Sequence, residues 1–248
     1  MKAQAYGRYV EESTGWLHAG RSEMVARVLG FFIPESARGA LEVLEVGAGA
    51  GQNVPALRQF GSVDAMEIAD MGVQALRQRD DVRTVIHAGI PSRLDRRYDI
   101  VCALDVIEHI EDDRMALEWM KEQLNPGGLL LITVPAHPWF FTRHDVALGH
   151  HRRYTRKAFR SVVPPGLELL ADSHFNTLLF PLAIASRLAW VLKTRIAPAK
   201  QIDKQPVPRQ GLVSRLLLAV FRWEVRATHP GTARSWGLSY YACLRKQG

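Results

Sequence analysis

The stretch Leu41-Glu-Val-Leu-Glu-Val-Gly-Ala-Gly-Ala-Gly-Gln-Asn53 decides the fold of this chain. A short apolar strand carries an acid at Glu45, and a loop with glycine at alternate positions follows it: Gly47, Gly49 and Gly51. Glycine permits backbone conformations that other residues avoid, and a helix behind such a loop aims its first amide groups at a ligand. The stretch therefore predicts a strand, loop and helix that bind a nucleotide-like cofactor.

The details of this loop separate two classes of cofactor. Dinucleotide-binding loops follow the pattern G-x-G-x-x-G, whereas here the third glycine comes one residue early. The carboxylate of Glu45 would repel a pyrophosphate and would suit a cationic ligand. A second acid, Glu67, ends the next strand-like segment, where ribose hydroxyl groups are bound in such folds. These details favour a cationic nucleotide cofactor over NAD or FAD.

Strand-like and helix-like segments alternate along the chain, which is typical of a parallel sheet covered on both faces. Ser22 is a predicted N-cap for a helix over 23–32, and Thr155 for one over 156–163. The region 135–154 is predicted to be an irregular loop. The predicted strands cover 41–46, 62–67, 82–87, 99–104, 129–134, 167–173 and 237–245. The other predicted helices cover 54–60, 72–78, 112–124, 178–193 and 212–226.

The composition fits one domain with a full core, since 47% of the 248 residues are hydrophobic and 23% are charged. We divide the chain into a helical cap (1–38), a cofactor-binding core (39–173), a helical insertion (174–236) and a last strand (237–248). Two cysteines, Cys102 and Cys243, lie in apolar strand-like runs, which predicts buried thiols and suits the reducing cytoplasm. The sequence shows neither a signal peptide nor an apolar run of about 20 residues.

The ordered set of motifs resembles the class I S-adenosylmethionine-dependent methyltransferases. Glu45-Val-Gly-Ala-Gly-Ala-Gly51 is similar to their first motif, Glu67 to their ribose-binding acid, and 99–110 and 125–133 to their fourth and fifth strands. The resemblance covers about residues 40–135. It implies a Rossmann-like, doubly wound α/β sheet of seven strands with the last strand antiparallel, and S-adenosyl-L-methionine as the methyl donor. The alternative is a different Rossmann-like nucleotide-binding protein.

The same resemblance implies cofactor contacts along these motifs. Adenine is expected near Gly89 and Ile90, and the methionine moiety near Leu104 and Asp105. The other expected cofactor contacts are Arg21, Glu45, Gly47, Ala48, Gly49, Gly51, Asn53, Glu67 and Ile68.

The segment Asp-Val-Ile-Glu-His at 105–109 is similar to the motif of a subgroup that includes quinone O-methyltransferases. Relatives of this type carry an arginine at the position of Arg21, which implies a contact with the cofactor carboxylate. The alternative for Arg21 is a solvated charge at the start of a helix. Asp105, Glu108 and His109 resemble a divalent-ion cluster of those enzymes, but the first position here is Asp rather than Glu, so the sequence leaves the metal open.

Methyl transfer is an in-line displacement, so the protein mainly aligns the reactants and excludes water. A base is needed when the acceptor enters protonated, and histidine suits this role near neutral pH. The candidate bases are His109, His144 and His150. The alternative for His109 is a turn histidine that packs against a neighbouring loop, and the alternative for the pair His144-Asp145 is that the two side chains diverge into solvent.

Residues 135–160 follow the edge of the sheet where open α/β folds bind their ligands. The run His150–Arg160 has five cations and no acid, and arginine suits bidentate recognition of phosphate or carboxylate. We therefore expect a small-molecule or lipid-linked acceptor, with an anionic group as one option. Structural salt bridges and ordinary core aromatics are the alternatives. The expected acceptor contacts are His137, Trp139, Arg152, Arg153 and Tyr154.

The net charge of +7 is concentrated in the insertion, which holds ten Lys/Arg and two acids over 174–236. Arg215, Arg222 and Arg226 lie close to one helical stripe beside leucine and tryptophan, as in helices that lie on an anionic membrane surface. That prediction would place the protein peripherally at the inner face of the membrane. A lid over the site and the packing surface of a homodimer are the alternatives.

The leading prediction is therefore a methyltransferase that acts on a small-molecule or lipid-linked acceptor, at oxygen. A nucleic-acid (RNA) methyltransferase is the second hypothesis, prompted by the basic charge. Against it, the turn after 99–104 lacks the Asn/Asp-Pro-Pro-aromatic motif of amino-directed base methylases, and the chain has no Pro-Cys nucleophile. A non-catalytic scaffold that binds the cofactor is the third.

Overall fold

The protein is described from a computed structural model, which covers residues 15–196 and 211–248. Seven strands form one sheet in the order β3-β2-β1-β4-β5-β7-β6. The parallel pairs lie among β1 to β5, whereas β7 runs antiparallel to both β5 and β6. The prediction of a doubly wound sheet with an antiparallel last strand is therefore confirmed. The strands are β1 (Leu41–Val46), β2 (Gly61–Glu67), β3 (Thr84–His87), β4 (Tyr98–Leu104), β5 (Leu124–Pro135), β6 (Leu167–Phe175) and β7 (Ser239–Lys246).

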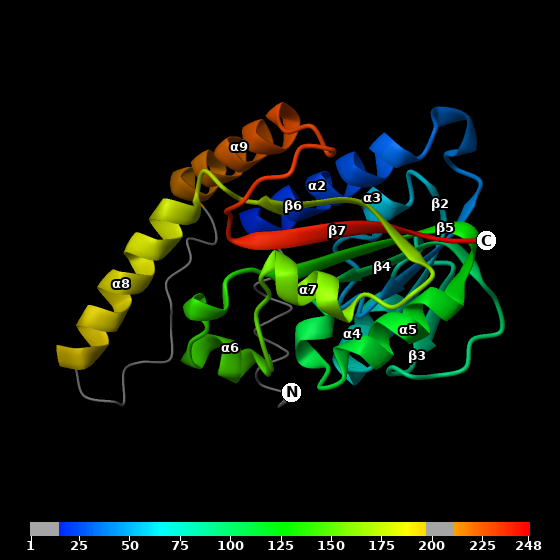
Figure 1. Ribbon diagram of the computed structural model, residues 1–248, viewed down its shortest axis with the longest axis horizontal. Coiled ribbons are helices and arrows are strands. Elements are labelled where there is room, and N and C mark those ends of the chain that lie inside the picture. Colours follow the sequence, from blue (N-terminus) through cyan, green and yellow to red (C-terminus); the bar gives the residue numbers. More distant parts are fainter. Residues whose placement is uncertain (1–14, 197–210) are drawn as a thin grey trace.

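Helices cover both faces of the sheet (Figure 1). They are α2 (Trp16–Phe32), α3 (Val54–Leu57), α4 (Asp70–Arg77), α5 (Asp113–Gln123), α6 (Arg143–Leu148), α7 (Arg156–Val162), α8 (Phe180–Ile196) and α9 (Leu212–Ala227). Three short 3₁₀ turns join them: η1 (Glu35–Ala37), η2 (Ile107–His109) and η3 (Pro138–Phe140). No helix among the described residues is both long enough and apolar enough to cross a membrane.

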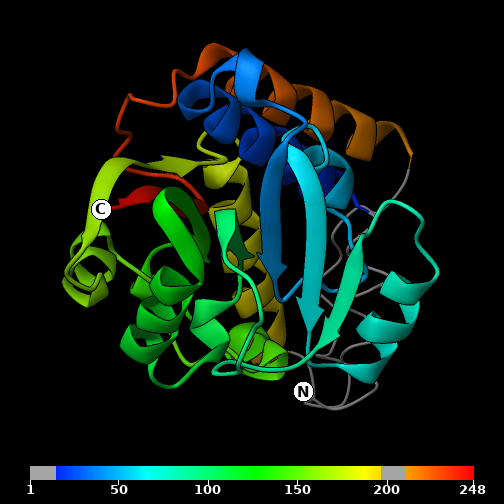
Figure 2. The same ribbon diagram turned by 90° about the vertical axis from the view of Figure 1, so that its right-hand side faces the viewer.

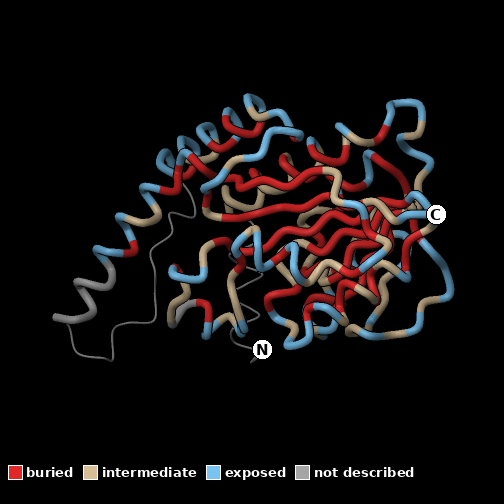
Figure 3. Tube along the Cα trace, viewed as in Figure 1, coloured by how far each residue is buried: buried red, intermediate tan, exposed pale blue. Residues whose placement is uncertain are grey.

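Two apolar layers enclose the sheet, because the side chains of its buried strands alternate between the two faces. On one face α2, α3 and α9 pack over Val43, Val63 and Cys102. On the other face α5 and α7 pack over Leu44 and Val101. Figures 2 and 3 show the helices on either side and the buried strands between them. The order of strands reverses between β1 and β4, and ligands of such folds bind beside the carboxyl ends of the strands at this point.

Several predicted elements differ from the structure. The first helix begins at Trp16, so Ser22 lies inside it and is not its N-cap. The Ser22 hydroxyl instead donates to Asn53 Oδ1 at 2.7 Å. Burial of Gly20, Met24 and Val25 against the core extends the helix past the local capping signal.

The region 135–154 is also more regular than predicted, since it forms η3 and α6. Asp145 holds the start of α6 by accepting from the Thr142 amide at 2.8 Å. The predicted helix over 54–60 is shorter, at Val54–Leu57, and β5 is longer, because it also includes 124–128. Thr155 caps α7 as predicted, accepting from the Ala158 amide at 3.0 Å.

The helices α2 and α9 cross at a point where only glycine fits. A Cβ atom built on Gly20 would lie 2.2 Å from Cδ1 of Phe221, whose side chain is fully buried. The close approach seats the Phe221 ring in the core beside Phe175. The position of α9, and with it half of the insertion, therefore depends on this glycine.

We expect Gly20→Ala to lower the free energy of unfolding by about 1–3 kcal/mol, because the added methyl group overpacks the contact with Phe221. Chemical denaturation of the purified protein measures the change. In the background of Phe221→Ala, which removes all of the clashing side-chain atoms, Gly20→Ala should cost clearly less than alone. Equal costs in the two backgrounds would contradict this account of the contact.

Candidate active site

The loop between β1 and α3 has the conformation that its glycines permit. Gly47, Gly49 and Gly51 all have positive φ, at 66°, 59° and 81°. At Gly47 a Cβ atom would also lie 2.7 Å from Cγ2 of Val106, so the backbone passes close to the turn after β4. The loop therefore exposes main-chain atoms, rather than side chains, at the carboxyl edge of the sheet.

The carboxylate of Glu67 fixes this loop to the end of β2. One oxygen accepts from the Gly49 amide at 2.8 Å, and the other accepts from the Ile68 and Ala69 amides at 2.9 and 2.8 Å. The predicted ribose acid is thus buried and engaged by backbone donors. Ile68 lies beside Gly89, where a Cβ atom would meet Ile68 Cδ1 at 2.8 Å, so these two predicted adenine-side residues are neighbours.

Glu45 is a second buried carboxylate under the same loop, with 1% of its surface exposed. One of its oxygens accepts from Asn53 Nδ2 at 2.9 Å, whereas Oε2 is buried with no hydrogen-bond partner among the described residues. Burial raises the pKa of Glu45 to about 7, against the opposing effect of the Asn53 hydrogen bond. The charge on this side chain is therefore sensitive to a nearby cation.

Arg21 reaches across from α2 to the end of β4. Its guanidinium forms an ion pair with Asp105 and also donates to Ser239 Oγ at 3.3 Å. Asp105 has φ 57°, and the Thr133 hydroxyl donates to its carboxylate at 3.2 Å. Arg21 thus lies inside a helix with an acidic partner, not as a solvated charge at a helix start.

These side chains enclose a recess of about 400 Å³, which is open to solvent, beside the glycine loop. Arg21, Gly47, Ala48, Asn53, Leu104 and Asp105, all predicted cofactor contacts, lie around it. The prediction missed His18, Val25, Gln52 and Thr133, which line it as well. His18 precedes Arg21 by one helical turn, and Thr133 ends β5, so helix periodicity and strand position could have found both. Burial, together with the charge of Arg21, lowers the pKa of His18 to about 4.

A group of possible metal ligands follows Asp105 along the chain. Ligand atoms of Glu108, His109 and His150 lie within 4.8 Å of one another. Asp105, which the sequence analysis named with Glu108 and His109 in a cluster resembling a divalent-ion site, is not in this group and pairs with Arg21, whereas His150 is in it. Both Glu108 oxygens are buried without a partner among the described residues. Burial, with the nearby charge of Asp105, holds the pKa of Glu108 well above its usual range.

The two candidate bases in this group have different surroundings. The rings of His109 and His150 meet edge to face with centroids 4.6 Å apart. Burial, together with the nearby His150, lowers the pKa of His109 to about 4. His150 Nδ1 lies 3.2 Å from Asp145 Oδ1, so it has a carboxylate to orient it. The third candidate, His144, belongs to α6, and its side chain lies outside the described residues.

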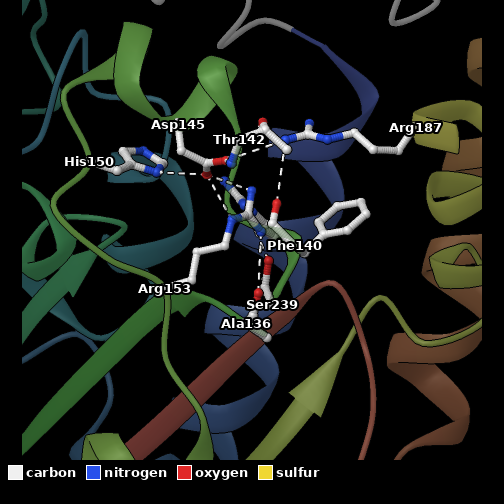
Figure 4. Close-up of polar contacts among 9 residues, drawn as sticks. Ala136, Phe140, Thr142, Asp145, His150, Arg153, Arg187 and Ser239 are labelled. Atoms are coloured by element: carbon white, nitrogen blue, oxygen red, sulfur yellow. Dashed lines mark hydrogen bonds and ion pairs between the residues drawn. The ribbon is translucent and has the colours of Figure 1, made fainter. Parts of the chain in front are cut away.

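Asp145 is fully buried at the centre of a polar cluster (Figure 4). It accepts from Arg153 Nε at 2.7 Å and from Thr142, and it pairs with Arg187 of α8 at 3.3 Å. Burial alone would raise its pKa, but the hydrogen bonds from His150 and Arg153 hold the pKa of Asp145 well below its usual range. Asp145 therefore remains ionised and joins α6, α8 and the segment of His150.

The other predicted acceptor contacts divide into basic and tyrosine side chains that bond to acids of the protein itself, and ring side chains that pack near Phe180. Arg152 pairs with Asp113 at 2.8 Å, and the buried hydroxyl of Tyr154 donates to the same carboxylate at 2.7 Å. With Arg153 on Asp145, these contacts favour the structural alternative for the basic run. His137 stacks on Phe180, with ring centroids 4.9 Å apart, and Trp139 beside it is 65% exposed.

The raised pKa of Glu45 predicts a dependence of stability on pH. The folded protein holds this proton up to about pH 7, whereas the unfolded chain releases it near pH 4.5. Glu45 therefore lowers stability progressively as the pH rises between these values, by on the order of 3 kcal/mol. Chemical denaturation at pH 5 and pH 8 measures the free energy of unfolding of Glu45→Gln and of the wild type. The variant should be more stable relative to the wild type at pH 8 than at pH 5. A constant difference would contradict the assignment.

Comparison with known proteins places this site in a family. The sequence model described as a methyltransferase domain matches residues 16–176, more than half of the chain. An uncharacterized methyltransferase of Mycobacterium leprae is 25% identical over 205 residues, 72% of this chain and 71% of that protein. A ubiquinone biosynthesis O-methyltransferase of Bradyrhizobium diazoefficiens is 28% identical over 110 residues, 41% of this chain and 42% of its own.

The fold is also shared with solved methyltransferases. A putative methyltransferase of Bacillus halodurans aligns with a TM-score of 0.58 and 18% identity, over 89% of this chain and 99% of its own. The plantazolicin methyltransferase BpumL, solved in complex with SAH, gives a TM-score of 0.60 and 11% identity, over 100% and 90%. The chain belongs to the methyltransferase domain family, and it is a class I S-adenosylmethionine-dependent methyltransferase.

Proposed function

We propose that this enzyme transfers the methyl group of S-adenosylmethionine to an oxygen atom of a small-molecule or lipid-linked acceptor. The observation that carries the proposal is the recess at the reversal of strand order, where a glycine loop meets buried acids and Arg21. The choice of oxygen rests on the relatives named as ubiquinone biosynthesis O-methyltransferases, which match 38–44% of the chain.

The residues around the recess fit this cofactor. When bound, S-adenosylmethionine supplies an electrophilic methyl group on a positively charged sulfur. Glu45 Oε2 and Arg21 Nε are buried polar atoms without a partner among the described residues, and they offer an acceptor and a donor to a polar ligand. Arg21 would hold the cofactor carboxylate, Glu67 and the neighbouring Ile68 and Gly89 would lie at the nucleoside, and Asp105 at the methionine moiety.

We assign the removal of the acceptor proton to His150. A hydroxyl acceptor must lose its proton as the bond to the methyl carbon forms. The Asp145 carboxylate holds His150 Nδ1, which leaves Nε2 to accept that proton, and it stabilises the imidazolium that results. His109 is a weaker base because burial lowers its pKa to about 4. Asp145 is thus a positioning residue, and the exposed Trp139 with His137 would line the acceptor side.

Isothermal titration with S-adenosylmethionine tests the cofactor half of the proposal. We expect saturable binding to the wild type and at least a hundredfold weaker binding to Gly49→Val, because a β-branched residue is strained at φ 59°. Arg93→Gln, an exposed change away from the recess, serves as the control and should bind normally. Absence of binding to the wild type, or unchanged binding to Gly49→Val, would overturn the assignment.

Methylation of a panel of phenolic acceptors with radiolabelled S-adenosylmethionine tests the acceptor half. His150→Gln should lower kcat by about 10²–10⁴-fold without changing cofactor affinity, whereas the exposed neighbour His151→Gln should not. Asp145→Asn should also lower kcat, since the neutral amide no longer offers His150 Nδ1 the carboxylate that orients the ring. Methyl transfer to nitrogen, to carbon or to RNA in product analysis would contradict the proposal.

A further inference from the structure

The helix α9 carries apolar side chains on both its buried face and its exposed face. Its inner face, with Phe221 and Val225, is buried against α2. Its outer face presents an apolar stripe at the spacing i, i+4, i+8, i+11, which we call the α9 stripe. The α9 stripe consists of Leu212, Leu216, Val220 and Trp223, which are 72%, 57%, 38% and 63% exposed.

The outer face of a surface helix is ordinarily polar. On α9 two polar residues, Ser214 and Glu224, are buried beside Phe221 and Val225, while leucine and tryptophan face outward. The Glu224 carboxylate is satisfied inside by the Thr177 amide at 2.8 Å. Such a contiguous apolar stripe on a surface marks a binding surface for another apolar phase or molecule.

The helix α8 also presents apolar side chains outward. Among its residues 180–189, whose side chains are described, Phe180 and Arg187 are buried, while Leu182 and Leu188 are 55% and 64% exposed. Figure 1 shows α8 extending away from the sheet, and Figure 3 shows exposed residues along both helices. The insertion therefore exposes apolar side chains on two helices, so the apolar surface does not depend on one residue alone.

Arginines flank the α9 stripe along one side. Arg215, Arg222 and Arg226 are all exposed, at the spacing i, i+7, i+11. Arg222 pairs with Glu23 at 2.5 Å, whereas Arg215 and Arg226 have no acidic partner within residues 15–196 and 211–248. A helix with an apolar stripe bordered by arginine has the design of one that lies in a membrane interface and attracts anionic lipid headgroups.

A second copy of this chain is a poorer match for the same surface. A two-fold interface brings the same residues from both copies together, so arginines would meet arginines. The described part of the insertion, 174–196 and 211–236, contributes one acid, Glu224, which is buried and already bonded. Anionic lipid supplies the complementary charge that a second copy lacks.

We propose that the α9 stripe docks this enzyme on the surface of an anionic bilayer, with α9 lying in the plane of the interface.

Vesicle flotation of the full chain tests this docking without any acceptor or cofactor. At low salt we expect the wild type to float with phosphatidylglycerol-containing vesicles and far less with phosphatidylcholine alone. Arg215→Gln with Arg226→Gln should weaken partitioning about thirtyfold, since each arginine near an anionic surface contributes a factor of about five. The matched double change Arg77→Gln with Arg93→Gln removes the same charge from exposed positions away from α9 and should leave flotation intact.

The apolar part has its own variants. Leu216→Ser with Trp223→Ser should weaken partitioning at least tenfold, because both side chains lose buried apolar area, whereas Ala219→Ser on the same helix should not. Thermal melts and S-adenosylmethionine titration of each variant separate loss of docking from loss of folding or of cofactor binding. Failure of the wild type to float, equal flotation with neutral vesicles, or a dimer in sedimentation that Leu216→Ser dissociates would each overturn the proposal.

Discussion

The hydrogen bonds of Glu67 hold together the part of the molecule on which the site depends. One buried carboxylate accepts from the backbone amides of the glycine loop and of the turn after β2. Charge-assisted bonds of this kind are strong, and the loop itself has few side chains with which to anchor itself. The strand order places this loop beside the end of β4, where Arg21 and Asp105 form their ion pair.

Much of the sheet could be predicted from the sequence, because strands that are buried on both faces read as short apolar runs between helices. The last strand was expected to be antiparallel only through the family resemblance. Ser22 shows the limit of local signals: burial of neighbouring residues on α2 extended the helix past its capping motif. The helix α6 escaped prediction because its start depends on Asp145, whose partners come from distant segments.

The residues of the sequence motifs could be placed at the recess from the sequence. The ion-pair partners of the other site residues could not, because these partners come from distant segments of the chain. Gly47, Ala48, Asn53 and Asp105 were found at the recess as expected. The basic run after His150 looked like a clamp for an anionic acceptor, yet Arg152 and Arg153 neutralise acids of the protein itself. The carboxylate of Asp105 forms an ion pair with Arg21, which lies 84 residues earlier in the chain, and Asp105 is not among the possible metal ligands Glu108, His109 and His150.

Arg187 has a consequence beyond the cohesion of the Asp145 cluster. It is buried on α8, and its ion pair lies on the carboxylate that orients His150 (Figure 4). Any force that displaces α8 must therefore separate this pair or carry α6 along with it. The position of α8 and the orientation of the His150 ring therefore depend on one shared carboxylate.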